Sequence, residues 1–246
     1  MATELCFFGP SHSGKTTLAV KMANYLAQKH TVILLFCDRV NPPIPWLFPR
    51  FRAENLKSIT TVLSAVEMTE EKIMHSVTVG KNANLLYLGY GSGENLYSFP
   101  AFGTGRAEVL LNNLGNLADY IVTDCMTDLT ADILTETVLK RADGVFRLYT
   151  PDLSSFSFYD SQLPLLSSSA YRAESHIKVL NCTSADVNLP ETEAAAALGK
   201  TPLRVPYVRT LRQQTAEGCL AETGSGKKIT AVLQKMAAAV TPKESL

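Results

Sequence analysis

Short, uninterrupted apolar runs alternate along this chain with longer stretches in which apolar residues recur at helical spacing. The apolar runs predict buried strands at residues 5–8, 31–37, 84–89, 120–123, 144–149, 177–180 and 203–206. The other stretches predict helices at residues 18–27, 58–80 (one or two helices), 107–117, 130–141, 153–170, 191–199 and about 226–240. Because strands and helices alternate, we expect an α/β fold in which helices cover both faces of a mostly parallel sheet. No repeat or linker interrupts residues 1–246, so a single three-layer α/β/α domain is predicted.

Local features refine this pattern. Thr69, followed by two glutamates, is a predicted helix N-cap inside residues 58–80. The proline-rich residues 41–45 are expected to break regular structure, and residues 90–105 predict a loop because Gly, Ser and aromatic residues dominate them. Pro164 must bend or start the helix that contains it.

Composition and charge narrow the class of protein. Of the 246 residues, 46% are hydrophobic, which suffices for one domain with a large core. Basic and acidic residues both number 23, so the net charge is zero. This balance argues against bulk electrostatic binding to nucleic acid or anionic lipid, and it leaves only a local patch for such partners.

The cysteines and the N-terminus indicate the compartment. The five cysteines are an odd number without a C-x-x-C pair, which favours free thiols in a reducing cytosol and argues against a zinc site. The N-terminus lacks a basic region followed by a cleavable apolar stretch. No apolar run approaches the ~18–20 residues that span a bilayer. We therefore expect a cytoplasmic protein.

The strongest chemical signal is a phosphate-binding loop near the N-terminus. Residues 9–16 match the pattern G-x-x-x-x-G-K-[ST], with the predicted strand 5–8 before them and the predicted helix 18–27 after them. Glycines let backbone N–H groups curl around a polyphosphate, and the helix N-terminus adds partial positive charge. The expected nucleotide-binding residues here are Gly9, Pro10, Ser11, His12, Ser13, Gly14, Lys15, Thr16 and Thr17. His12 contacts phosphate or is simply a tolerated loop side chain.

Two residues of this loop have specific expected roles. Lys15 is expected to reach the β- and γ-phosphates, and the Thr16 hydroxyl is expected to bind Mg²⁺. The motif therefore predicts ATP or ADP together with Mg²⁺ as cofactors.

Polar residues also stand at the carboxyl ends of other predicted strands, where ligands bind in open parallel sheets. Asp124 is expected to hold Mg²⁺ through water. Asp38 is expected to orient the attacking water or to help fix the metal. Asn181 occupies the third strand end. The alternative for each aspartate is a turn or helix-capping role, which is common for Asp after a strand.

The order of these parts resembles the ParA/MinD superfamily, the deviant-Walker group of P-loop ATPases, over residues 9 to about 236. The matching parts, in chain order, are the phosphate loop, the strand ending in Asp38, the segment 118–124 ending in Asp124, the "aD-x-v" strand at 142–145, Asn181, and the "i-P-y"-like segment 205–207 with Ala216-Glu217-Gly218 after it. Residues 60–98 look most like the CpaE/TadZ branch, whose members help position and assemble Tad-type pili.

This resemblance implies a P-loop NTPase fold and a nucleotide-switched ATPase. Lys15 and Asp38 are the implied catalytic residues, while Asn181 and Pro206 are implied to contact adenine. It also implies a homodimer in the ATP state and a protein partner from a pilus, secretion or partition system.

Three departures from the family pattern predict slow hydrolysis. The signature lysine that follows the first loop glycine is replaced by Pro10, and the usual x-P-x-G after the metal aspartate reads Cys-Met-Thr-Asp here, ending in Asp128. The first acid of the D-x-D strand end is Phe36. Arg106 is the substitute cation to consider if turnover is fast. Because the three departures weaken the case for hydrolysis and leave the case for nucleotide binding intact, a scaffold that binds ATP without hydrolysing it is the main alternative function.

A signal-recognition-type GTPase is a further alternative, because those enzymes share the start of the loop. They also need a guanine-reading aspartate, and residues 181–186 do not have that spacing.

Three further features of the sequence bear on whether the protein binds a membrane, DNA or another protein. The last helix has an apolar face that could sit on a membrane, but packing on the sheet is favoured because its polar face is not strongly basic; the apolar residues are Ile229, Val232, Leu233, Met236 and Val240. Arg204, Arg209 and Arg212 form a small basic cluster, yet the zero net charge does not favour DNA binding. Trp46, in the proline-rich loop beyond Asp38, either docks a partner or packs on the sheet.

Overall fold

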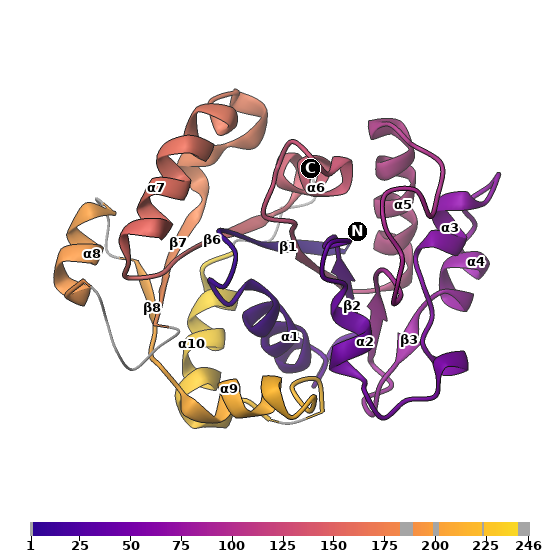
Figure 1. Cartoon of the computed structure of the whole chain (residues 1–246), viewed down its shortest axis with the longest axis horizontal. Coiled ribbons are helices and arrows are strands. Elements are labelled where there is room, and N and C mark those ends of the chain that lie inside the picture. Colours follow the sequence, from indigo (N-terminus) through magenta and orange to yellow (C-terminus); the bar gives the residue numbers. More distant parts are fainter. Residues whose placement is uncertain (1, 183–188, 199–201, 223, 241–246) are drawn as a thin grey trace.

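The computed structural model describes residues 2–182, 189–198, 202–222 and 224–240, and its centre is an eight-stranded sheet (Figure 1). The strand order is β3-β4-β2-β5-β1-β6-β7-β8, and every neighbouring pair is parallel except β3 with β4. The strands are β1 (Thr3–Phe8), β2 (Val32–Phe36), β3 (Thr78–Val79), β4 (Leu85–Leu88), β5 (Tyr120–Asp124), β6 (Gly144–Tyr149), β7 (Ile177–Asn181) and β8 (Leu203–Val205). The predicted α/β fold with a mostly parallel sheet is confirmed.

Helices cover both faces of this sheet. They are α1 (Lys15–Leu26), α2 (Pro43–Leu47), α3 (Thr60–Ser64), α4 (Glu70–His75), α5 (Thr104–Leu117), α6 (Ile133–Arg141), α7 (Leu153–Gln162), α8 (Glu191–Ala197), α9 (Arg209–Ala216) and α10 (Gly226–Ala238). Short 3-10 helices are η1 (Ala53–Asn55), η2 (Leu163–Leu166), η3 (Ser169–Tyr171) and η4 (Ala173–Ser175). In Figure 1, α1, α9 and α10 lie on one side of the sheet, and α5, α6 and α7 lie on the other.

The continuous apolar runs become strands that are buried on both faces, as expected for parallel sheets. In β1, Leu5 and Phe7 pack in the core beneath α1 and α10, whereas Cys6 and Phe8 pack in the core beneath α5, α6 and α7. Because side chains alternate along a strand, one apolar run supplies both cores. Strand β1, which leads directly into the phosphate loop, is therefore packed on both of its faces.

Several predicted elements differ in the structure. Residues 58–80 hold α3 and α4, but their end forms β3, which is too short to give a sequence pattern. The helix predicted at 153–170 is wrong beyond α7, because Pro164 occupies the first turn of η2, where its missing N–H is tolerated. The proline-rich residues 41–45 were expected to break regular structure, but Pro43 starts the short helix α2.

Two further differences concern the C-terminal half. Helix α9 was not predicted from the sequence, because Leu211 is its one buried residue and no apolar stripe marks it. The helix predicted at 191–199 is α8, and residue 199 lies outside the described residues.

Helix α10 packs on the protein's own sheet, as favoured. Ile229, Leu233 and Met236 are fully buried in the core shared with α1 and β8. In the described part of the chain, the structure contains no helix of the length and hydrophobicity that crossing a bilayer requires.

A buried lysine ties helix α1 to the segment after α9. Lys21 is fully buried, and its Nζ donates a hydrogen bond of 2.8 Å to the carbonyl oxygen of Leu220. Gly218 supports the same segment: its φ is +63°, and a Cβ there would clash with the ring of Pro49. The C-terminal part of the chain is thus held against the helix that begins at the phosphate loop.

Burial lowers the pKa of Lys21 to about 8, whereas an unfolded lysine titrates near ~10.4. Between these values the unfolded state binds more protons, so the free energy of unfolding should rise as the pH increases from about 8 to 10. We predict that Lys21→Met loses this rise, measured by urea denaturation at pH 8 and pH 9.5. Identical pH slopes in the variant and the wild type would contradict the assignment.

Candidate functional site

A cleft of about 1140 Å³ opens along the carboxyl edge of the sheet. Loops that follow β1, β2, β5, β7 and β8 line it, together with parts of α1, α2 and α9. This is the edge at which open parallel sheets bind their ligands. The strand ends singled out in the sequence therefore meet at one place.

The loop between β1 and α1 has the backbone that a phosphate cradle requires. Gly14 has a φ of +85°, and α1 begins directly after it at Lys15. A Cβ at Gly9 would lie 2.8 Å from the carbonyl oxygen of Leu148, so only glycine fits beside β6. The Ser13 hydroxyl donates to the carbonyl oxygen of Pro10 at 2.7 Å, which closes the turn.

The predicted loop residues do different things in this arrangement. Ser11, His12, Gly14, Lys15, Thr16 and Thr17 line the cleft, whereas Gly9, Pro10 and Ser13 are buried and shape the turn. His12 has a left-handed backbone conformation, with a φ of +61°, and its side chain is exposed.

Lys15 is saturated with hydrogen bonds inside the cleft. Its Nζ donates to the carbonyl oxygens of Gly9 at 2.9 Å and Pro10 at 3.1 Å, and to the hydroxyl of Thr127 at 2.9 Å. Burial lowers the pKa of Lys15, and the nearby charge of Asp124 opposes that shift. Thr127 was missed in the sequence analysis, because a threonine in a loop after a strand carries no specific signal.

Thr16 and Asp124, the two residues expected to bind a metal, contact each other at the start of α1. The Thr16 hydroxyl donates to Asp124 Oδ2 at 2.6 Å, while the buried Asp124 Oδ1 has no partner among the described residues. Burial raises the pKa of Asp124 to about 6, although the positive charge of Lys15 and the Thr16 hydrogen bond lower it. An unpartnered carboxylate oxygen beside a hydroxyl is a donor set that suits Mg²⁺.

The described residues contain no cluster of three or more His, Cys, Asp or Glu side chains able to hold a metal ion. Mg²⁺ is commonly bound by one or two carboxylates together with waters and substrate phosphates, so a single buried aspartate beside Thr16 fits that ion. The residues present fit magnesium held jointly with a nucleotide.

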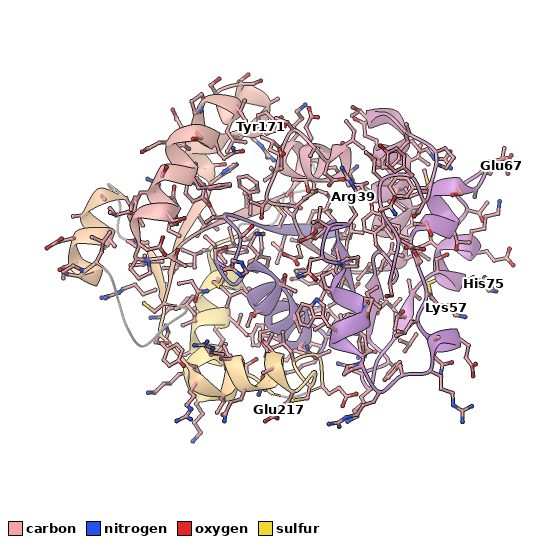
Figure 2. All side chains as sticks on the ribbon, viewed as in Figure 1. Arg39, Lys57, Glu67, His75, Tyr171 and Glu217 are labelled. Carbon is pink, nitrogen blue, oxygen red and sulfur yellow. The ribbon has the colours of Figure 1, made fainter. Side chains whose placement is uncertain are left out.

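Asp38 lies in the cleft but has a local role as well. Its Oδ1 accepts hydrogen bonds from the backbone N–H groups of Val40 at 2.9 Å and Asn41 at 3.0 Å, which is the turn role considered for it. The neighbouring Arg39, labelled in Figure 2, extends to Asp132 at 3.0 Å, which joins the loop after β2 to the start of α6. Arg39 is therefore committed to a structural ion pair.

Asn181 and Pro206 lie at the other end of the cleft. Asn181 Nδ2 donates to the carbonyl oxygen of Ser13 at 2.7 Å, so the side chain links β7 to the phosphate loop. Pro206 lines the cleft close to it, together with Tyr207 and Arg212, two residues that were not predicted to lie there. Residues 183–186, part of the segment considered for guanine reading, lie outside the described residues.

Other residues discussed from the sequence occupy definite positions. Asp128 is exposed, and its carboxylate accepts from the N–H and hydroxyl of Thr130 at 2.9 and 2.7 Å. Arg106 does not face the cleft: it donates to carbonyl oxygens at the end of α3, including that of Leu63 at 3.0 Å, so it is wrong as a substitute cation. Trp46 lines the cleft from α2 and is partly buried, so it does pack on the molecule.

A tyrosine stack supports the base of the loop from the opposite face of the sheet. The buried Tyr159 hydroxyl donates to the carbonyl oxygen of Leu148 at 2.8 Å, with that of Phe8 at 3.2 Å. Its ring stacks on Tyr149 at a centroid distance of 4.0 Å, and the guanidinium of the buried Arg147 lies over both rings. Tyr159 thereby joins the end of β1, which leads into Gly9, to the neighbouring end of β6.

The sequence matches no protein-family model and no curated protein, whereas the fold matches many solved structures. The septum site-determining protein MinD from Pyrococcus horikoshii, complexed with Mg-ADP, has a TM-score of 0.75 at 14% identity and covers 100% of both chains. A putative plasmid partition protein from Borrelia burgdorferi, bound to AMPPNP, has a TM-score of 0.67 at 15% identity, over 97% of this chain and 98% of that one. A MinC:MinD complex from Aquifex aeolicus has a TM-score of 0.71 at 15% identity, over 99% of each chain. This chain therefore has the fold of MinD and ParA proteins.

The buried carboxylate of Asp124 should cost stability in the ligand-free protein. Because its pKa is raised to about 6 from 3.8, the stability linked to the shift is present below about pH 4 and lost as the pH rises through 6. We predict that Asp124→Asn raises the free energy of unfolding by about 1–3 kcal/mol at pH 7.5 and by much less at pH 4.5, measured by urea denaturation without nucleotide.

The matched control for this comparison is Asp38→Asn, which keeps an acceptor for the turn and removes a partly exposed charge. We expect it to change the free energy of unfolding by less than about 0.5 kcal/mol. A destabilised Asp124→Asn protein at pH 7.5 would show that Lys15 and Thr16 compensate the ionised carboxylate well.

Proposed function

We propose that this chain binds Mg-ATP in the cleft and acts as a slow, nucleotide-switched ATPase of the positioning or assembly type. The observation that carries the proposal is the group formed by Lys15, Thr16 and Asp124 at the start of α1. The Thr16 hydroxyl is bonded to a buried carboxylate that keeps one unpartnered oxygen, and the phosphate-loop lysine lies beside it. These groups have the chemistry that a metal-bound triphosphate needs.

Each residue has a role that follows from its position. Backbone N–H groups at the start of α1 and the Lys15 ammonium bind phosphate oxygens. Thr16 and Asp124 would hold Mg²⁺, which supplies charge neutralisation at the β- and γ-phosphates when bound. Asp38, across the cleft, is the group proposed to orient a water. Asn181 and Pro206 form the adenine end, because an amide offers both a donor and an acceptor to the base.

The solved structures support the nucleotide and the class of protein without settling the partner. Proteins of this fold have been captured with Mg-ADP, with AMPPNP and in a complex with MinC. By analogy we propose a homodimer in the ATP state and a protein partner of a pilus, secretion or partition system. The pilus-assembly type, resembling CpaE/TadZ, rests on residues 60–98. We propose a cytoplasmic location, with peripheral membrane contact as the alternative.

Nucleotide binding should depend on Lys15. Because Lys15→Ala removes a charge-assisted contact to phosphate, we expect a loss of about 2–4 kcal/mol, or roughly 30- to 1000-fold in Mg-ATP affinity. Calorimetric titration of the purified protein with Mg-ATP measures it. Lys29→Ala is the matched control, since Lys29 is exposed just beyond α1 and should leave affinity unchanged.

The same titration with GTP tests the base. The amide of Asn181 favours adenine, so GTP should bind at least about tenfold more weakly than ATP. Unchanged affinity in Lys15→Ala would defeat nucleotide binding at this loop, and equal binding of GTP would favour the GTPase alternative.

Hydrolysis should be slow because few charges face the γ-phosphate. Pro10 replaces the family's signature lysine, and Arg39 is paired with Asp132. Loss of one transition-state stabiliser typically costs about 10²–10³ in rate, so we predict turnover well below ~1 s⁻¹ in a phosphate-release assay. Pro10→Lys should raise this rate only at protein concentrations that support a dimer.

Turnover of several per second without a partner would contradict this prediction. Arg212, which lines the cleft from α9, would then be the next cation to test. No detectable turnover together with tight Mg-ATP binding would favour the non-hydrolysing scaffold.

A further inference from the structure

Thr127 places an unused hydrogen-bond donor beside the phosphate-loop lysine. Its Oγ1 accepts from Lys15 Nζ at 2.9 Å, and the half-buried side chain lines the cleft. A threonine hydroxyl that accepts a hydrogen bond keeps its own proton to donate. No hydrogen bond from this hydroxyl to an acceptor is present among the described residues. An anion that binds Lys15 would meet both the ammonium and this hydroxyl.

The loop that presents Thr127 is pinned on both sides. The backbone N–H of Met126 donates to the buried Thr135 hydroxyl at 2.9 Å, and Asp128 is held by the N–H and hydroxyl of Thr130. Thr127 therefore does not depend on a bound ligand for its place. A preorganised donor costs little to align with an incoming charge.

Strand order indicates which phosphate Thr127 meets. Along the sheet, β7 with Asn181 is followed by β6, by β1, which leads into the phosphate loop, and by β5, which ends at Asp124 and leads into the loop with Thr127. A nucleotide with its base at β7 and its β-phosphate at the start of α1 must extend its terminal phosphate toward β5. Thr127 thus stands at the end of the phosphate chain, on the far side of Lys15 from the base.

We propose that the Thr127 hydroxyl donates to the γ-phosphate and so distinguishes a nucleoside triphosphate from a diphosphate, an inference that rests on the proposed function. In this structure the same hydroxyl accepts a hydrogen bond from Lys15. When a triphosphate binds, the ammonium exchanges its present acceptors for phosphate oxygens, and the Thr127 hydroxyl, already in place, donates its proton to the γ-phosphate. The resemblance does not supply this role, because Thr127 belongs to the segment in which this chain departs from the family pattern.

The test compares two ligands on matched variants. Calorimetry in Mg²⁺ measures the affinities of ADP and of the β,γ-imido analogue of ATP, which avoids hydrolysis. Because a hydrogen bond to a charged group changes affinity by about tenfold or more, Thr127→Val should bind the analogue about tenfold more weakly and ADP within about twofold of wild type. Thr127→Ser should restore the analogue's affinity to within about threefold of wild type.

Thr230→Val is the control, since its hydroxyl donates to the carbonyl oxygen of Gly226 within α10 and does not line the cleft; both affinities should stay within about twofold of wild type. Thermal melts establish that each variant is folded, and Thr127→Ala replaces the valine variant if that one is not. Equal losses for both ligands, or none for either, would overturn the inference while leaving nucleotide binding intact. Failure of the wild type to bind either ligand would instead overturn the proposed function and the inference with it.

Discussion

The hydrogen bond between Thr16 and Asp124 is the contact on which the rest of the site depends. Asp124 ends β5 in register with Phe7 of β1 and Phe36 of β2, so its carboxylate is enclosed by the middle of the sheet. Burial there raises its pKa, and the compensation from Thr16 and Lys15 is partial. An ionised carboxylate in this position reduces the stability of the protein, and the proposed Mg²⁺ would offset that cost by neutralising the charge.

The phosphate loop is held from several directions that the loop sequence does not contain. Tyr159 joins the ends of β1 and β6 beneath it, Asn181 reaches it from β7, and Lys21 fixes α1 to the segment that follows α9. These contacts come from distant parts of the chain. They keep the backbone N–H groups in place without a ligand, which reduces the ordering cost of binding.

The side chains of Lys15 and Asn181 already make hydrogen bonds within the protein, whereas one oxygen of Asp124 has no partner among the described residues. The Lys15 ammonium donates to two loop carbonyl oxygens and to the Thr127 hydroxyl, and the Asn181 amide donates to the carbonyl oxygen of Ser13. The proposed nucleotide would have to exchange these contacts for its own, so its net affinity would be the difference between two sets of hydrogen bonds. A ligand that replaces more of these hydrogen bonds would favour the bound arrangement more strongly. A triphosphate offers more oxygens for such hydrogen bonds than a diphosphate.

The sequence by itself determined the sheet, the phosphate loop and the strand-end residues Asp38, Asp124 and Asn181, because continuous apolar runs and a spaced glycine–lysine motif are local signals. It did not determine β3, α9 or the split after α7, where the elements are short, polar or ended by one proline. Nor could it supply Thr127 or remove Arg106 from the site. Their partners lie 112 and 43 residues away, and only the packing of strands and helices decides which distant groups meet.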